Sequence, residues 1–121
     1  MRILIAILLA CVLVACSSEG PVPSDRSAYV GAYAYKSIDN SVDKATDHEL
    51  DRLVLNTDGR YTLMQGGSTK ARSEITGMWT LVPGTPPNID LDHHGYPIEL
   101  KDGHIRLLIN DDLGEWYAKL N

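Results

Sequence analysis

The stretch Tyr96-Pro-Ile-Glu-Leu-Lys-Asp-Gly-His-Ile-Arg-Leu-Leu-Ile109 gives the strongest indication of the fold. Asp102-Gly103 at its centre favours a two-residue hairpin turn, because the usual form of that turn needs a positive φ at both positions. The turn fixes the cross-strand pairs, and those expected on the apolar face are Leu100 with Ile105, Ile98 with Leu107 and Tyr96 with Ile109. Glu99 is expected opposite Arg106 on the other face, as a pair of opposite charges.

A second hairpin is predicted over Leu53–Leu63. Thr57-Asp58-Gly59 fits a three-residue loop with Gly59 in the left-handed conformation, which sets Leu55 opposite Tyr61. The same register sets Leu53 opposite Leu63 on that face. Two hairpins that each present one apolar face indicate antiparallel β structure.

Alternation of apolar and polar residues predicts further strands. The eight expected strands lie near residues 28–36, 51–56, 60–65, 73–82, 87–92, 96–101, 104–109 and 115–120. Such regular spacing is typical of a sandwich or barrel, and eight short strands can close into a small barrel whose interior is filled or holds one ligand. We therefore expect an all-β domain over 28–121, an antiparallel meander that closes into a barrel with Trp79 and Trp116 in its core.

The order of these elements resembles the small lipocalin-like barrels of bacterial lipoproteins, among them the N-terminal domain of NlpE. The matching motifs, which together cover most of residues 28–121, are Gly31-Ala-Tyr33, Leu55-Asn-Thr-Asp-Gly-Arg-Tyr61, Gly77-Met-Trp79 and the Asp102-Gly103 turn. NlpE-like domains carry a Cys-x-x-Cys pair that this chain lacks. The resemblance therefore implies the fold and the cell envelope rather than a copper or thiol-redox activity.

Residues 1–15 predict a secretory signal peptide. After Arg2, an apolar run extends from Ile3 to Ala15, shorter than the roughly 20 residues of a membrane-spanning helix. The run ends in Leu13-Val14-Ala15-Cys16, which resembles the lipobox of bacterial lipoproteins. The resemblance implies cleavage before Cys16, attachment of a diacylglycerol to its thiol and acylation of its new amino group. An ordinary signal peptide followed by an unrelated cysteine is the alternative.

A second lipobox-like match ends at Cys11, but cleavage there would leave an apolar mature start, whereas Cys16 is followed by the polar residues Ser17-Ser18-Glu19-Gly20. We expect lipidation at Cys16, with the diacylglycerol and acyl chain attached there and no other cofactor. Ser17 resembles the residue found after the cysteine in lipoproteins sorted to the outer membrane, which implies an anchor in that membrane. We expect the domain to face the periplasm, although the residue itself does not indicate the face. Residues 16–27, rich in Ser and Pro, are expected to form a flexible lipid-anchored linker.

The composition is that of one globular domain: 121 residues, of which 44% are hydrophobic and 22% charged. Sixteen acidic against eleven basic residues give a net charge of −5. This charge argues against a nucleic-acid binder, because contacts with phosphates need a basic surface.

Asp90, Asp92 and His94 form the densest cluster of possible metal ligands. On a strand these alternate residues share a face and would offer two carboxylates and an imidazole to a metal ion. His48 or His104 would add a fourth ligand. The alternative is a polar strand edge that runs into a turn.

Asp39, Asp43, Asp47 and Asp51 recur every four residues. On a helix they would share one face, where like charges repel unless a cation or a basic partner neutralises them. They are candidates for binding a basic partner, because complementary charge speeds association. The alternative is a solvated loop.

Catalytic motifs are missing from the sequence, which has no Gly-x-Ser-x-Gly elbow, no phosphate-binding loop and, once Cys16 is lipidated, no free cysteine nucleophile. We expect a non-enzymatic protein-binding module, an inhibitor, immunity or accessory protein held at the membrane by its lipid. Its expected partner is a basic envelope protein or toxin. The alternative is a lipocalin-like binder or sensor of a small apolar ligand, which requires an open apolar barrel interior.

Overall fold

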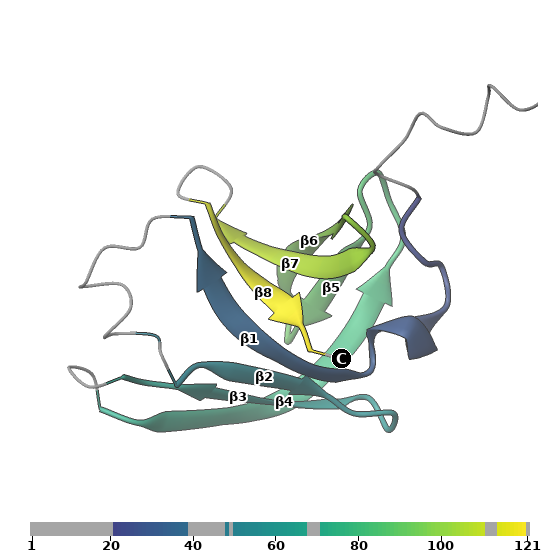
Figure 1. Ribbon diagram of the computed structural model, residues 1–121. Coiled ribbons are helices and arrows are strands. Elements are labelled where there is room, and N and C mark those ends of the chain that lie inside the picture. Colours follow the sequence, from purple (N-terminus) through teal and green to yellow (C-terminus); the bar gives the residue numbers. More distant parts are fainter. Residues whose placement is uncertain (1–20, 39–47, 49, 68–70, 111–113, 121) are drawn as a thin grey trace, which may run out of the picture.

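The computed structural model describes residues 21–38, 48, 50–67, 71–110 and 114–120 (Figure 1). The predicted signal peptide and Cys16 lie outside the described residues. Among the residues that are described, no helix combines the length and the hydropathy needed to span a bilayer.

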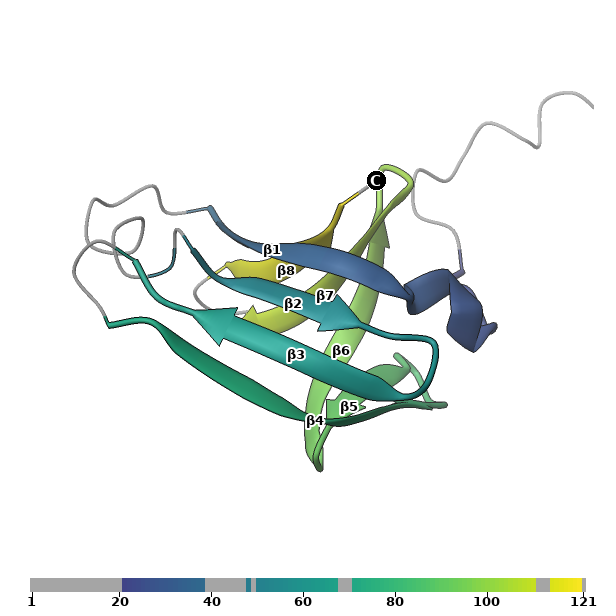
Figure 2. The same ribbon diagram turned by 90° about the horizontal axis from the view of Figure 1, so that it is seen from below.

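Eight antiparallel strands form a closed barrel, in which each strand pairs with the next along the chain and β8 pairs with β1. Figure 2 shows β6 running steeply across the direction of β1 to β4. The prediction of an all-β, eight-stranded barrel is confirmed. The strands are β1 (Gly31–Ser37), β2 (Arg52–Leu55), β3 (Arg60–Gln65), β4 (Ser73–Val82), β5 (Asn88–Leu91), β6 (His94–Lys101), β7 (His104–Asn110) and β8 (Glu115–Lys119).

Both predicted hairpins have the expected turns and registers. Asp102 and Gly103 have φ angles of 52° and 79°, and Gly59 has a φ of 91°. The pairs found as expected are Ile98 with Leu107, Leu100 with Ile105, Glu99 with Arg106, Leu53 with Leu63 and Leu55 with Tyr61. The ladder between β6 and β7 stops before Tyr96.

The chain enters the barrel through a 3-10 helix, η2 (Arg26–Tyr29), where the sequence predicted the start of a strand. Asp25 caps this helix, since its carboxylate accepts a hydrogen bond from the backbone N–H of Ser27 at 3.1 Å. The turn carries the Tyr29 side chain into the core, where it is fully buried. Val22 also packs against the core. Residues 22–29 therefore contact the barrel, although 16–27 were expected to form a flexible linker.

The two ends of the barrel differ in the elements that close them. At the N-terminal pole, Arg26 of η2 donates a hydrogen bond to the carbonyl of Thr57 in the β2–β3 turn, at 3.2 Å. At the loop pole, β1 ends and β8 begins, and the N–H of Ile38 donates to the carbonyl of Gly114 at 2.9 Å. In Figure 1, β1 runs from η2 on the right to the loop pole on the left.

The core lies inside the barrel and consists of side chains from every strand and from η2. Its largest member is Trp79, which is 1% exposed. The buried cluster comprises Tyr29, Tyr33, Leu53, Leu55, Tyr61, Leu63, Trp79, Ile89, Leu91, Ile98, Leu107 and Tyr117.

Candidate functional site

The interior of the barrel is packed with aromatic side chains, and their polar atoms are paired. Near the N-terminal pole, the Trp79 indole N–H donates to the carbonyl of Asn56 at 2.8 Å. The Tyr33 hydroxyl donates to the carbonyl of Tyr29 at 2.6 Å. No buried side-chain nitrogen or oxygen lacks a hydrogen-bond partner among the residues that are described. These described side chains therefore form a packed, hydrogen-bonded core.

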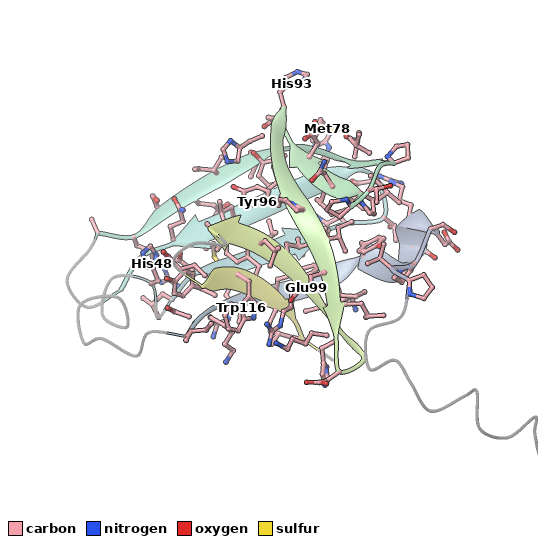
Figure 3. The ribbon with its side chains drawn as sticks, turned by 90° about the horizontal axis from the view of Figure 1, so that it is seen from above. His48, Met78, His93, Tyr96, Glu99 and Trp116 are labelled. Atoms are coloured by element: carbon pink, nitrogen blue, oxygen red, sulfur yellow. The ribbon has the colours of Figure 1, made fainter. Side chains whose placement is uncertain are left out.

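Trp116 was expected in the core beside Trp79, and this prediction is wrong. The inward positions of β8 belong to Tyr117, which is 3% exposed, so the neighbouring Trp116 lies on the outer face. There the Arg106 guanidinium lies 4.2 Å from its ring centroid. Arg106 also forms an ion pair with Glu99, at 3.5 Å between Nη1 and Oε1. Figure 3 shows Trp116 and Glu99 near one another on that side of the barrel.

Asp51 is the one buried charged residue in the part of the chain that the structure describes, with 1% of its surface exposed. One carboxylate oxygen accepts a hydrogen bond from the backbone N–H of Gly66 at 2.8 Å, and the other lies 2.9 Å from Nδ1 of His48. The His48 ring stacks on Tyr35, with 4.4 Å between ring centroids. Asp51 thus joins the start of β2 to the end of β3 and fixes His48 at the loop pole.

Tyr35 extends this network across the barrel mouth, because its hydroxyl donates to the Glu115 carboxylate at 2.5 Å. Burial, reinforced by the bond to Glu115, raises the pKa of Tyr35 well above its usual range. Burial also raises the pKa of Tyr117, with further contributions from Tyr96 and Asp51. We call Tyr35, His48, Asp51 and Glu115 the polar cap. Its members are joined by contacts between side chains at the loop pole.

The predicted acidic stripe divides at the boundary of the described residues. Asp39, Asp43 and Asp47 lie outside them. Asp51, counted as the fourth member of an exposed stripe, is buried in the polar cap instead. Asp51 has the same spacing in the sequence as the other three, but its carboxylate accepts a hydrogen bond from the backbone N–H of Gly66, which is fifteen residues away.

Asp90, Asp92 and His94 are not brought together as the metal prediction required. Asp90 lies on the outer face of β5 and pairs with Gly95, and His94 packs edge-on against Tyr96, with centroids 5.0 Å apart. Asp92 has a φ of 48° and belongs to the turn between β5 and β6, so the alternation of a strand does not apply to it. Within the described residues, no group of three or more His, Cys, Asp or Glu side chains is placed to hold a metal ion.

Asp92 has a structural role that the sequence did not reveal. Its carboxylate accepts hydrogen bonds from the Tyr61 hydroxyl at 2.9 Å and from the backbone N–H of Met78 at 3.1 Å. It lies directly over Gly77, where an added Cβ would be 1.9 Å from the carboxylate oxygen. Only glycine leaves room for this contact, which joins β4 to the β5–β6 turn. Burial and the bond to Asp92 raise the pKa of Tyr61 to about 12.

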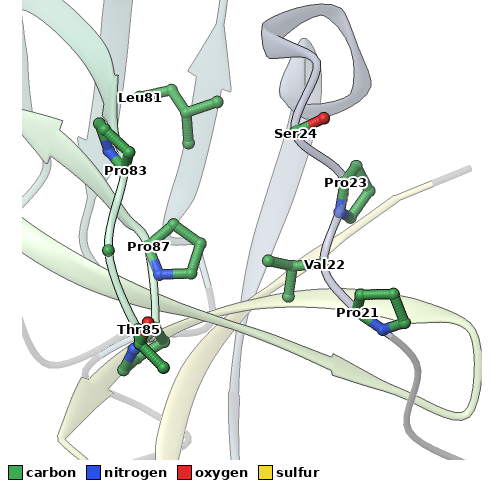
Figure 4. Close-up of a pocket in the computed structure, with 10 residues that line it drawn as sticks. Pro21, Val22, Pro23, Ser24, Leu81, Pro83, Thr85 and Pro87 are labelled. Carbon is green, nitrogen blue, oxygen red and sulfur yellow. The ribbon is translucent and has the colours of Figure 1, made fainter.

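An apolar groove of about 620 Å³ lies at the N-terminal pole, where Val22 and Leu81 of its lining also pack against the core. One wall is the segment Pro21–Ser24, and the facing wall consists of Leu81 and the β4–β5 connection, Pro83–Pro87. Figure 4 shows the Val22 side chain pointing across the groove toward the opposite wall. None of its lining residues is charged. Sequence reasoning missed this groove because its walls are about sixty residues apart and neither carries a motif.

No protein-family model matches the chain, and comparison with curated proteins and with solved structures gives no match. Function must therefore be inferred from the geometry and chemistry of the two poles.

Proposed function

We propose that this chain is an envelope lipoprotein, anchored through Cys16, whose barrel is a non-enzymatic module that binds a basic protein partner through the loop pole. The observation that carries this proposal is the filled interior. Because buried aromatic and aliphatic side chains pack together inside the barrel, we place recognition on its outer surface.

The position of the N-terminus favours the loop pole as the binding surface. Only four residues separate Cys16 from Pro21, which lies at the N-terminal pole. A fully extended chain gains at most about 3.6 Å per residue, so an anchor at Cys16 would hold this pole within roughly 18 Å of the membrane interface. The opposite pole would face away from the membrane and be accessible to a partner.

The charges in the sequence near the loop pole suit a basic partner. Besides the buried Asp51, the sequence between Ser37, where β1 ends, and Arg52, where β2 begins, contains Asp39, Asp43, Asp47 and Glu49 and one basic residue, Lys44. Asp111 and Asp112 lie between β7 and β8, which meet at the same pole. Acidic surface of this kind accelerates encounter with a basic protein, and the effect weakens as salt is added.

The test is capture of partners from solubilised envelope by the full-length, lipidated protein. The loop-pole variant carries Asp39→Asn, Asp43→Asn and Asp47→Asn, and the matched control carries Asp58→Asn, Asp90→Asn and Asp102→Asn, which change the net charge equally. We expect the wild-type protein to capture a stoichiometric partner and the control variant to bind it equally well. The loop-pole variant should bind the same partner with an association rate roughly tenfold below that of the wild-type protein at low salt. Equal binding by both variants, or no saturable partner, would contradict the proposal.

Cys16→Ser tests the anchor separately. The intact mass of this variant is expected to show no lipid, whereas that of the wild-type protein should show the attached lipid. A wild-type protein without lipid would overturn the anchoring and leave the partner experiment unaffected.

A further inference from the structure

The proline-lined groove at the N-terminal pole lies where the proposed lipid anchor would emerge. Its first wall, Pro21–Ser24, is the first described segment after Cys16. A role for this groove in holding that lipid rests on the lipidation of Cys16 proposed above. The experiment at the end of this subsection distinguishes failure of the groove as a lipid site from failure of the lipidation.

The walls of the groove are fixed in place without any ligand. Tyr29 is fully buried, and its hydroxyl donates a hydrogen bond to the carbonyl of Pro23 at 2.5 Å, which holds the first wall against the barrel. Leu81 belongs to β4 and pairs with Ile89, so the second wall is part of the sheet. Proline rings at Pro83, Pro86 and Pro87 restrict the backbone of that wall further. The groove is therefore preorganised.

The chemistry of the lining selects an apolar, uncharged occupant. Prolines, Val22 and Leu81 provide most of the surface, and the polar side chains are two hydroxyls, on Ser24 and Thr85. Exposing a groove of this kind to water is unfavourable in free energy, because the transfer of apolar surface out of water is favourable. A hydrocarbon chain satisfies these conditions, and it needs no specific hydrogen bond.

The length of chain between Cys16 and the groove identifies a source for such a hydrocarbon chain. Four residues separate Cys16 from Pro21, a reach of at most roughly 18 Å when extended. A lipid chain spans about half of a hydrocarbon core that is roughly 30 Å thick, or about 15 Å. An acyl chain attached at Cys16 is thus long enough, and close enough, to enter the groove of its own molecule.

We propose that this groove binds one acyl chain of the lipid carried by Cys16 of the same molecule. Occupancy docks the N-terminal pole against the anchor, and the barrel then keeps a fixed orientation instead of swinging on a linker. The loop pole is directed away from the lipid as a result.

Cross-linking with a free photoreactive palmitate tests whether the groove binds an acyl chain. The cross-linked residues are mapped by mass spectrometry. The full-length lipidated protein is placed in phosphatidylcholine nanodiscs, and Cys16→Ser is assayed with the same nanodiscs added. We expect cross-links at 21–24 and 83–87 in Cys16→Ser at a yield at least about tenfold above that of the lipidated protein, because the attached chain competes for the groove at high effective concentration.

Two substitutions in the Cys16→Ser background locate the site. Val22→Glu on the first wall and Leu81→Glu on the second are each expected to abolish the cross-links, whereas Val82→Glu, at an adjacent exposed position, retains them. Val22 lies outside the strands, so Val22→Glu does not interrupt the sheet. This variant alone can test the site if Leu81→Glu fails to fold.

Three outcomes would overturn the proposal. Equal labelling of the lipidated and Cys16→Ser proteins would show a groove open to free apolar ligands, and labelling of neither would show that it takes no acyl chain. Cross-links confined to other residues would also exclude it. Each of these results can occur while the intact mass confirms lipid on Cys16, so the groove can fail as a site while the anchor stands.

Discussion

The two poles of the barrel are closed by different chemistry. At the N-terminal pole, Trp79 and Tyr33 are buried and direct their polar atoms to backbone carbonyls. At the loop pole, His48 contacts Asp51 and Tyr35 contacts Glu115, so these contacts join one side chain to another. The acceptors at the N-terminal pole are backbone carbonyls, which remain when a side chain is replaced, whereas either partner of a side-chain pair in the polar cap can be removed by substitution. The N-terminal pole thus depends on packed aromatic side chains, whereas the loop pole depends on pairs of polar side chains.

The largest effect should come from removing the packing at the N-terminal pole. Trp79→Ala removes a buried ring that also receives the Arg26 guanidinium, 4.3 Å from its centroid. We expect the free energy of unfolding to fall by about 3–5 kcal/mol in urea denaturation. Trp116→Ala, on the outer face, should lower it by less than about 1.5 kcal/mol, since it loses partial packing and a cation–π contact. Equal losses would mean that both tryptophans support the core.

Breaking the polar cap should have a smaller effect. Asp51→Ala leaves the N–H of Gly66 without its acceptor and is expected to cost about 1–3 kcal/mol of stability in the same urea denaturation. Asp51→Asn keeps an oxygen acceptor of the same shape and should recover much of that loss. If the two substitutions are equally destabilising, the negative charge near His48 matters more than the hydrogen bond to the backbone.

Alkaline pH should weaken both poles through their tyrosines. Burial raises the pKa of Tyr33 and Tyr35 above the ordinary value of 10.0, so the unfolded chain ionises first. Their stabilisation is therefore complete below pH 10 and is lost as the pH rises toward the folded-state pKa. Above pH 10, Tyr33→Phe should reduce the slope of stability against pH by at most about 1.4 kcal/mol per unit, and Tyr35→Phe should reduce it by less, because solvent screens this partly exposed side chain. Unfolding measured from pH 9 to 11 checks this, and an unchanged slope in either variant would contradict it.

The smallest effect should come from the exposed ion pair. Arg106 and Glu99 are each partly exposed, and such pairs contribute about 0–1 kcal/mol. A double-mutant cycle with Arg106→Ala and Glu99→Ala should give a coupling energy in this range, decreasing with added salt. A larger coupling would mean that the pair, with Trp116, stabilises the β6–β8 sheet more than its exposure suggests.

The fold could be predicted from the sequence because its hairpins are local. Asp102-Gly103 and Gly59 fix their registers within a few residues, and the alternation of the flanking strands then assigns the faces. Trp116 was misplaced because both faces of its strand carry apolar residues, so alternation alone did not distinguish it from Tyr117.

The site could not be predicted in the same way, because its contacts are distant in sequence. Asp51 depends on Gly66, and Asp92 depends on Tyr61 and Gly77. Each aspartate belonged to a local pattern that suggested an exposed ligand. The fold instead used both carboxylates to accept hydrogen bonds from neighbouring strands.

The pairing of β8 with β1 has a consequence for how the chain can be cut and rejoined. The N–H of Leu120 donates to the carbonyl of Ala32 at 2.8 Å, and Lys119 pairs with Tyr33, so the start of β1 and the end of β8 lie side by side at the N-terminal pole. A circularly permuted chain, joined there by a short linker and opened at Asp102-Gly103, keeps the partners of all eight strands. In the chain that is not permuted, a reporter fused to the C-terminus is expected to lie beside η2 at the N-terminal pole and to leave the loop pole uncovered.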